Sequence, residues 1–135
     1  MSNSLAGFFT AITTAMEGGT LGYHYAEFDF KGTPSSQIDK AYFVEDSLSA
    51  CTDESGRKVM KRRAMDVSFA YHCGAGLAPK TIALAAYTEL EKVEDALLVA
   101  TNDWVDIGQC CFEKHIVSNY LLARITLMIT YRRDL

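Results

Sequence analysis

The fold is decided by a long stretch near the middle of the chain, Arg57-Lys-Val-Met-Lys-Arg-Arg-Ala-Met-Asp-Val-Ser-Phe-Ala-Tyr-His-Cys73. Over Met65–Tyr71 every second side chain is large and apolar, which is the period of a β-strand with one buried face. The stretch Ala41–Ala50 alternates in the same way, and Asp53-Glu-Ser-Gly56 between the two is typical of a turn. The sequence therefore predicts an antiparallel hairpin.

The second strand of this hairpin is long for a chain of 135 residues. At roughly 3.3 Å per residue, a straight strand over 57–73 spans about 55 Å. A compact domain of this length measures roughly 35–40 Å across. The outer part of the strand carries five basic residues and too little apolar material to be buried within its own subunit. We therefore expect a projecting hairpin arm over about residues 50–64.

Apolar periodicity predicts two helices and further strands around the hairpin. The first helix is capped by Ser2 or Asn3 and ends at Gly18-Gly19, and the second begins at Pro79. The helices run to about Met16 and Glu94, residues 97–99 extend the second helix or start a short strand, residues 20–40 hold a short strand or an aromatic loop, and strands over 109–117 and 120–131 close the chain. This order predicts a single α+β domain over residues 1–135, with an antiparallel sheet and two helices packed on one face.

Composition excludes several classes of protein. Thirteen Lys and Arg stand against seventeen Asp and Glu, a formal charge of −4, which is the wrong balance for a protein that coats duplex DNA or an anionic membrane. No apolar run is long enough to span a bilayer, and the amino terminus does not resemble a secretory signal. The four cysteines are too few and too oddly placed for a disulfide framework, so we expect reduced thiols and synthesis in a cytoplasm.

No pattern in the sequence predicts catalysis. Cys111, Glu113 and His115 share the spacing of one strand face, but two closely spaced ligand pairs of the kind that zinc needs are missing. Gly74-Ala-Gly76 precedes a helix without the Lys and third glycine of a phosphate loop, and there is no Gly-x-Ser-x-Gly nucleophile elbow. Trp104 lies in a loop, where its indole is expected to cover an edge of the core. We expect neither an enzyme, nor a metal site, nor a cofactor.

One basic cluster stands out, and it has three interpretations. With nearby aromatics it could bind single-stranded nucleic acid, or it could protect an exposed strand edge against aggregation. It could also pair with the acidic side of the second helix in another copy of the chain, which suits a head-to-tail ring, and this is the interpretation we favour. The basic residues are Arg57, Lys58, Lys61, Arg62 and Arg63, and the acidic ones are Glu89, Glu91, Glu94 and Asp95.

The order of elements resembles the tail terminator family of long-tailed bacteriophages, of the lambda type, with its related neck and tail-completion proteins. Two segments carry the resemblance: Met65-Asp-Val-Ser-Phe-Ala-Tyr71, followed by a glycine break and a helix, and the closing strand Leu121-Leu-Ala-Arg-Ile-Thr-Leu-Met-Ile-Thr-Tyr131. The chain departs from the family at Lys40-Ala41, where many relatives have a proline, and in the aromatic stretch Tyr23–Phe30 and the pair Cys110-Cys111.

The resemblance implies a structural virion protein that forms a homo-oligomeric ring, typically a hexamer. Such a ring caps the tail tube, ends its polymerisation and joins it to the head connector at the tail–neck junction, after assembly in the host cytoplasm. Its partners are then further copies of itself, the tail tube protein and the neck proteins, without membrane or specific nucleic-acid binding. The alternatives are an adjacent head–tail completion protein and a non-viral α+β interaction domain.

Overall fold

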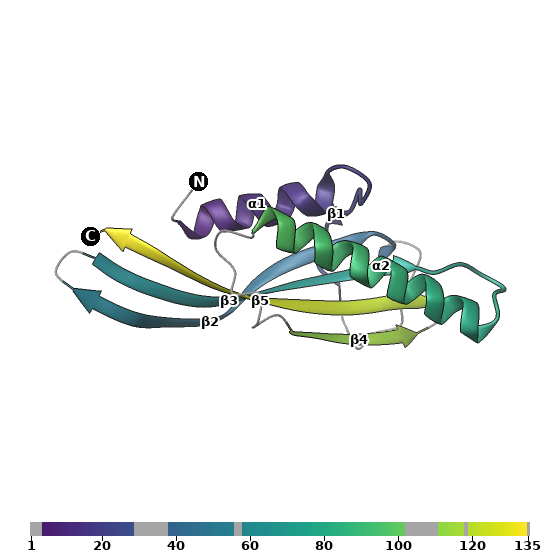
Figure 1. Cartoon of the computed structure of the whole chain (residues 1–135). Helices are drawn as coiled ribbons and strands as arrows, with labels where there is room; N and C mark the ends of the chain where they lie inside the picture. The colour runs from purple at the N-terminus through teal and green to yellow at the C-terminus, as the bar shows by residue number, and fades with distance from the viewer. Residues whose placement is uncertain (1–3, 29–37, 56–57, 102–110, 118, 135) are drawn as a thin grey trace.

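The computed structural model describes residues 4–28, 38–55, 58–101, 111–117 and 119–134. Two helices lie over one face of a sheet, as predicted, and the chain has an α+β fold (Figure 1). The elements in chain order are α1 (Leu5–Glu17), β1 (His24–Tyr25), β2 (Ala41–Ser55), β3 (Lys58–His72), α2 (Pro79–Ala100), β4 (Cys111–Val117) and β5 (Tyr120–Asp134).

The described strands form one sheet in the order β1-β2-β3-β5-β4. β2, β3, β5 and β4 pair antiparallel, but the short β1 pairs parallel to the start of β2, so the sheet is mixed rather than purely antiparallel. Residues 26–40 connect β1 to β2, and only part of this connection lies within the described residues. A register shift between Asp46 and Leu48 interrupts the alternation that the sequence predicts over Ala41–Ala50. A second shift lies between Cys51 and Asp53, and β2 continues to Ser55 through part of the predicted turn.

The predicted projecting arm over residues 50–64 is not confirmed. β2 and β3 do form the hairpin, but β5 pairs with β3 from His72↔Tyr120 to Lys58↔Asp134. This end of the hairpin is therefore one part of a three-stranded sheet. The third strand is β5, which the sequence predicts to end at Tyr131; it continues to Asp134 and pairs with β3 along the whole outer part of the hairpin.

Both helices differ from their predicted bounds. α1 begins one residue after Ser4, whose hydroxyl accepts a hydrogen bond from the backbone N–H of Gly7 at 3.1 Å, so the cap is Ser4 rather than Ser2 or Asn3. It ends at Glu17 with Gly18 as its C-cap, which confirms the predicted stop at Gly18-Gly19. α2 begins at Pro79 but continues past Glu94 to Ala100, which settles the open choice for residues 97–99 in favour of helix.

The main core lies between the two helices and the sheet face that carries the predicted alternating residues of β3 and β5. Phe8 and Ile12 of α1 and Leu97 of α2 are fully buried there. The opposite face is not simply solvated, because Ala70, Tyr120 and Leu122 form a second buried cluster with Phe28 and Ile38 packed against it. The alternating pattern correctly predicted which strand residues face the helices. It did not predict that Phe28 and Ile38 pack against the opposite face.

Candidate interaction site

The predicted basic cluster follows β3 toward the hairpin end. Arg57 lies outside the described residues, and Lys58, Lys61 and Arg62 are described only as backbone positions of β3. Arg63 is half-buried, and its guanidinium donates a hydrogen bond to the Asp46 carboxylate on the neighbouring strand at 2.6 Å. The one member with a described side chain is thus paired within its own subunit.

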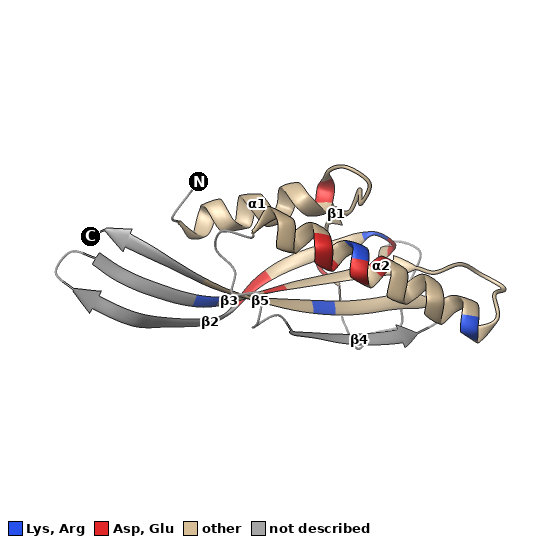
Figure 2. Ribbon diagram, viewed as in Figure 1, with Lys and Arg blue, Asp and Glu red and all other residues tan. Residues whose placement is uncertain are grey.

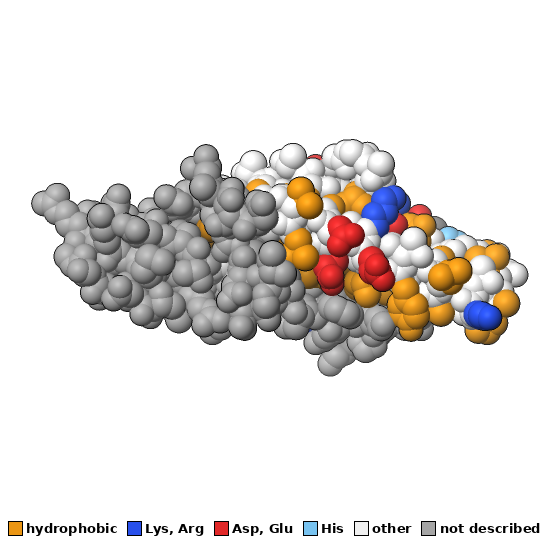
Figure 3. All heavy atoms as spheres, viewed as in Figure 1, with side chains coloured by type: hydrophobic (Ala, Val, Ile, Leu, Met, Phe, Trp, Pro, Cys, Tyr) orange, Lys and Arg blue, Asp and Glu red, His pale blue; other side chains and the backbone are white. Residues whose placement is uncertain are grey.

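The predicted acidic face of α2 needs one correction. Among the described residues, acidic positions recur along the ribbon of α2 (Figure 2). Glu91 and Asp95 are exposed and Glu94 is half-buried, and acidic side chains gather over α2 in the surface view (Figure 3). Glu89, which the sequence placed on this solvated side, is instead 5% exposed. The reason is a partner far away in sequence: the Tyr23 hydroxyl donates to Glu89 Oε2 at 2.7 Å.

Glu89 belongs to a buried polar cluster where the start of β2 meets α2. Lys40 lies over the Tyr23 ring, 5.0 Å from its centroid, and donates from Nζ to the Leu21 carbonyl at 2.6 Å. Burial, reinforced by the negative charge of Glu89, raises the pKa of Tyr23 above its ordinary value. The hydroxyl therefore stays protonated and remains a hydrogen-bond donor. We call the Tyr23–Glu89 pair the buried latch, because it joins the segment after α1 to helix α2.

A second tyrosine–carboxylate pair joins α1 to the sheet. The hydroxyl of Tyr42, a fully buried residue of β2, donates to Glu17 at the end of α1. Burial, together with this hydrogen bond, raises the pKa of Tyr42. Neither pair has the nucleophile, base and orienting group that covalent catalysis requires.

The one cysteine with a described side chain, Cys73, is a free and buried thiol. Burial raises its pKa, so the reactive thiolate is disfavoured and the residue behaves as an apolar core group. The side chains of Cys111, Glu113 and His115, and Trp104 as a whole, lie outside the described residues. Within the described part of the chain, no three His, Cys, Asp or Glu residues come together as a metal site.

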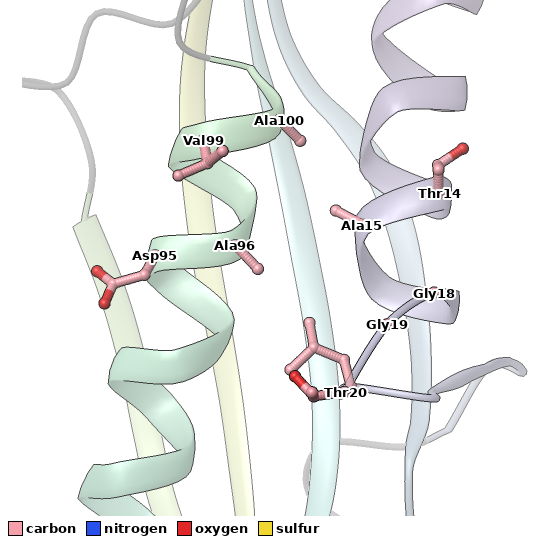
Figure 4. A pocket seen from close by; sticks show the side chains of 10 residues that line it. Thr14, Ala15, Gly18, Gly19, Thr20, Asp95, Ala96, Val99 and Ala100 are labelled. Carbon is pink, nitrogen blue, oxygen red and sulfur yellow. The ribbon is translucent and has the colours of Figure 1, made fainter.

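A hollow of about 550 Å³ separates the carboxyl-terminal ends of α1 and α2. Most of its lining residues are small, with Ala15 of α1 facing Ala96 and Ala100 of α2 (Figure 4). Asp95 points away from its centre in the same view. A ligand site needs polar groups that converge on the ligand, and the hollow does not show this feature.

A second hollow, which we call the β2 groove, has a volume of about 480 Å³ and lies between α1 and the edge of the sheet. Phe9 of α1, 39% exposed, lines it and contacts the Tyr25 ring at a centroid distance of 6.0 Å. The sequence predicts a short strand or an aromatic loop for the stretch that starts at Tyr23, and it gives no signal for the groove beside it. The lining residues are Leu5, Ala6, Phe9, Thr10, Val44, Asp46 and Met65.

In the described part of the chain, the sheet has an incomplete edge on each side. β1 covers β2 only at Ala41 and Tyr42, and β4 covers β5 only up to Thr126. Among the described residues, no strand pairs with the outer edge of β2 beyond this point or with the outer edge of β5 from Leu127 to Asp134. An uncovered strand edge offers backbone donors and acceptors to another chain.

Comparison with known protein-family models and with curated proteins finds no match to this chain. Among the described residues, neither helix has the length and apolar character needed to cross a membrane.

Proposed function

We propose that the protein is a structural subunit of a phage virion that assembles into a homo-oligomeric ring, with six copies as the expected number. The ring caps the tail tube, ends its polymerisation and joins the tube to the neck proteins at the head connector. It acts by binding and blocking, without a chemical step. The proposal rests on the resemblance in element order together with the α+β fold.

The observation that carries the ring is that, among the described residues, β2 and β5 each keep part of an outer edge with no neighbouring strand. A chain with two different open edges can pair head to tail, and such contacts close into a ring when the rotation between copies closes. The basic residues of β3 and the acidic residues Glu91, Glu94 and Asp95 of α2 offer another head-to-tail contact.

The test is the solution mass of the purified full chain by light scattering after gel filtration, with negative-stain images of the peak. A ring predicts a mass of about six times 14.9 kDa and particles with a central hole. A chain that stays monomeric up to its highest soluble concentration would contradict the proposal. A stable dimer would also contradict it, because a two-fold contact does not build a ring of this size.

A further inference from the structure

The edge of β2 is capped for a short distance, and beyond this cap no described residue pairs with it. The backbone N–H of Ala26 donates to the Tyr42 carbonyl at 2.9 Å. One step further, the Tyr25 hydroxyl accepts from the N–H of Val44 at 3.2 Å and donates to its carbonyl at 3.3 Å. The side chain of Tyr25 thus takes the place of a neighbouring strand. Since outward peptide groups alternate along a strand, Asp46 holds the next outward pair, and no described residue bonds to it.

The β2 groove begins where this cap ends. Val44 and Asp46 pair with Val67 and Met65, so they share the sheet face that α1 partly covers. The groove lies on that face at the edge. A strand added beside β2 would place alternate side chains on the same face, next to α1. A backbone edge with an adjoining hollow for side chains is the usual arrangement for recognition by strand addition.

The open edge of β5 lies at the same level of the sheet. Register pairs place Leu127 opposite Met65, which is opposite Asp46, and Asp134 opposite Lys58, which is opposite Ser55. Both strands are antiparallel to β3, so they run in the same direction. Rotation about an axis along the strands therefore brings β5 of one copy beside β2 of the next in parallel, without a shift along the strands.

The sequence makes the two edges opposite in charge at matching positions. Arg132 and Arg133 of β5 pair with Met60 and Val59 of β3. The same two residues of β3 pair on their other side with Asp53 and Glu54 of β2. Two basic positions on one edge thus stand at the level of two acidic positions on the other, which favours a contact between unlike edges over one between like edges.

We propose that the β2 edge and the β2 groove form one strand-addition site, and that its occupant is the outer edge of β5, residues 127–134, from a second copy of this chain. The two strands run parallel and the contact is head to tail. Each copy contributes its β5 edge to one neighbour and its β2 edge to the other neighbour. The inference rests on the proposed ring and names the contact that closes it.

Charge exchange between the edges tests this contact. One variant carries Asp53→Lys with Glu54→Lys, and another carries Arg132→Glu with Arg133→Glu. Each variant alone brings like charges together at every contact, so light scattering at low salt should show loss of the ring. Mixing the two restores opposite charges at both kinds of contact, and so does combining all four substitutions in one chain. Both should recover the mass of the ring.

The groove is tested separately on α1. Ala6→Phe fills the β2 groove from an exposed helix position, and it should weaken assembly at least tenfold in the concentration needed for ring formation. Thr14→Phe places the same side chain at an exposed position of the same helix beside the other hollow, and it should leave assembly unchanged. Far-UV circular dichroism of each variant confirms that the chain is folded.

The outcomes separate the contact from the ring. A wild-type monomer overturns the proposed function itself. A wild-type ring that survives either charge reversal, or reversals that the mixture does not rescue, overturns the strand-addition site and leaves the ring in place. Assembly by the Arg132→Glu, Arg133→Glu variant alone would show that the charges of the β5 edge are not part of the contact, and would also overturn the proposal.

Discussion

The two ends of the sheet differ in how they are covered. At the level of Tyr42, Phe69 and Ala123, side chains are buried beneath two helices and two tyrosine–carboxylate pairs hold the neighbouring elements in place. At the level of Asp53 and Arg132, β2, β3 and β5 pair with one another, and within the described residues β2 and β5 each keep an outer edge without a strand. We infer that the first end stabilises the subunit and the second is available to partners.

The largest effect is expected from a cavity at the covered end. Phe69 is fully buried and packs edge-on against the Tyr23 ring, with centroids 5.6 Å apart. Phe69→Ala should lower the free energy of unfolding by about 3–5 kcal/mol. Urea denaturation at several protein concentrations measures this, because the concentration series separates subunit stability from assembly.

Phe9→Ala is the matched control for this cavity. It removes the same ring from a side chain that is 39% exposed, and it should cost about 1 kcal/mol or less. Equal losses for the two variants would show that burial at the covered end does not dominate the stability of the subunit.

The buried latch should have the next largest effect. Glu89→Ala leaves the Tyr23 hydroxyl without its acceptor in a buried site, and we expect a loss of about 1–3 kcal/mol in unfolding free energy. Glu91→Ala, two residues along the same helix, removes an exposed carboxylate and should change stability by less than about 0.5 kcal/mol. A double-mutant cycle with Tyr23→Phe should return a coupling energy, and independent effects would mean that the hydrogen bond does not stabilise the fold.

The latch also shows where sequence reasoning reached its limit. The period of two along β3 and β5 predicted the helix-side residues correctly, because a sheet face is a local property of each strand. The sequence predicted a solvated Glu89 because helical periodicity relates only residues three and four positions apart. Its hydrogen-bond partner Tyr23 is 66 residues away. The β2 groove could not be predicted for the same reason, because it forms only where α1 and β2 come together in the fold. The sequence shows that both segments contain charged residues, but only the strand register shows that Arg132 and Asp53 lie at the same level of the sheet.

High pH should weaken the covered end through the same tyrosine. An unfolded tyrosine has a pKa of about 10, and burial raises the pKa of Tyr23 above that value in the folded chain. The unfolded state then releases its proton first, so stability is complete below about pH 10 and declines as pH rises further. Tyr23→Phe should flatten this decline in urea midpoints measured from about pH 8 to 11. A slope that the substitution leaves unchanged would assign the decline to other groups, including Tyr42 and Tyr71, whose pKa values burial also raises.

The smallest effect is expected on the outer face of α2. Glu91→Lys with Asp95→Lys reverses two exposed charges there, and it should change unfolding free energy by less than about 0.5 kcal/mol. If edge pairing closes the ring, the mass in solution should also stay the same. This pair of reversals distinguishes the two head-to-tail contacts, because the contact between the basic residues of β3 and α2 depends on this acidic face and the edge contact does not. Loss of the ring in this variant, with the ring retained in the Arg132→Glu, Arg133→Glu variant, would move the subunit contact from the sheet edge to the helix.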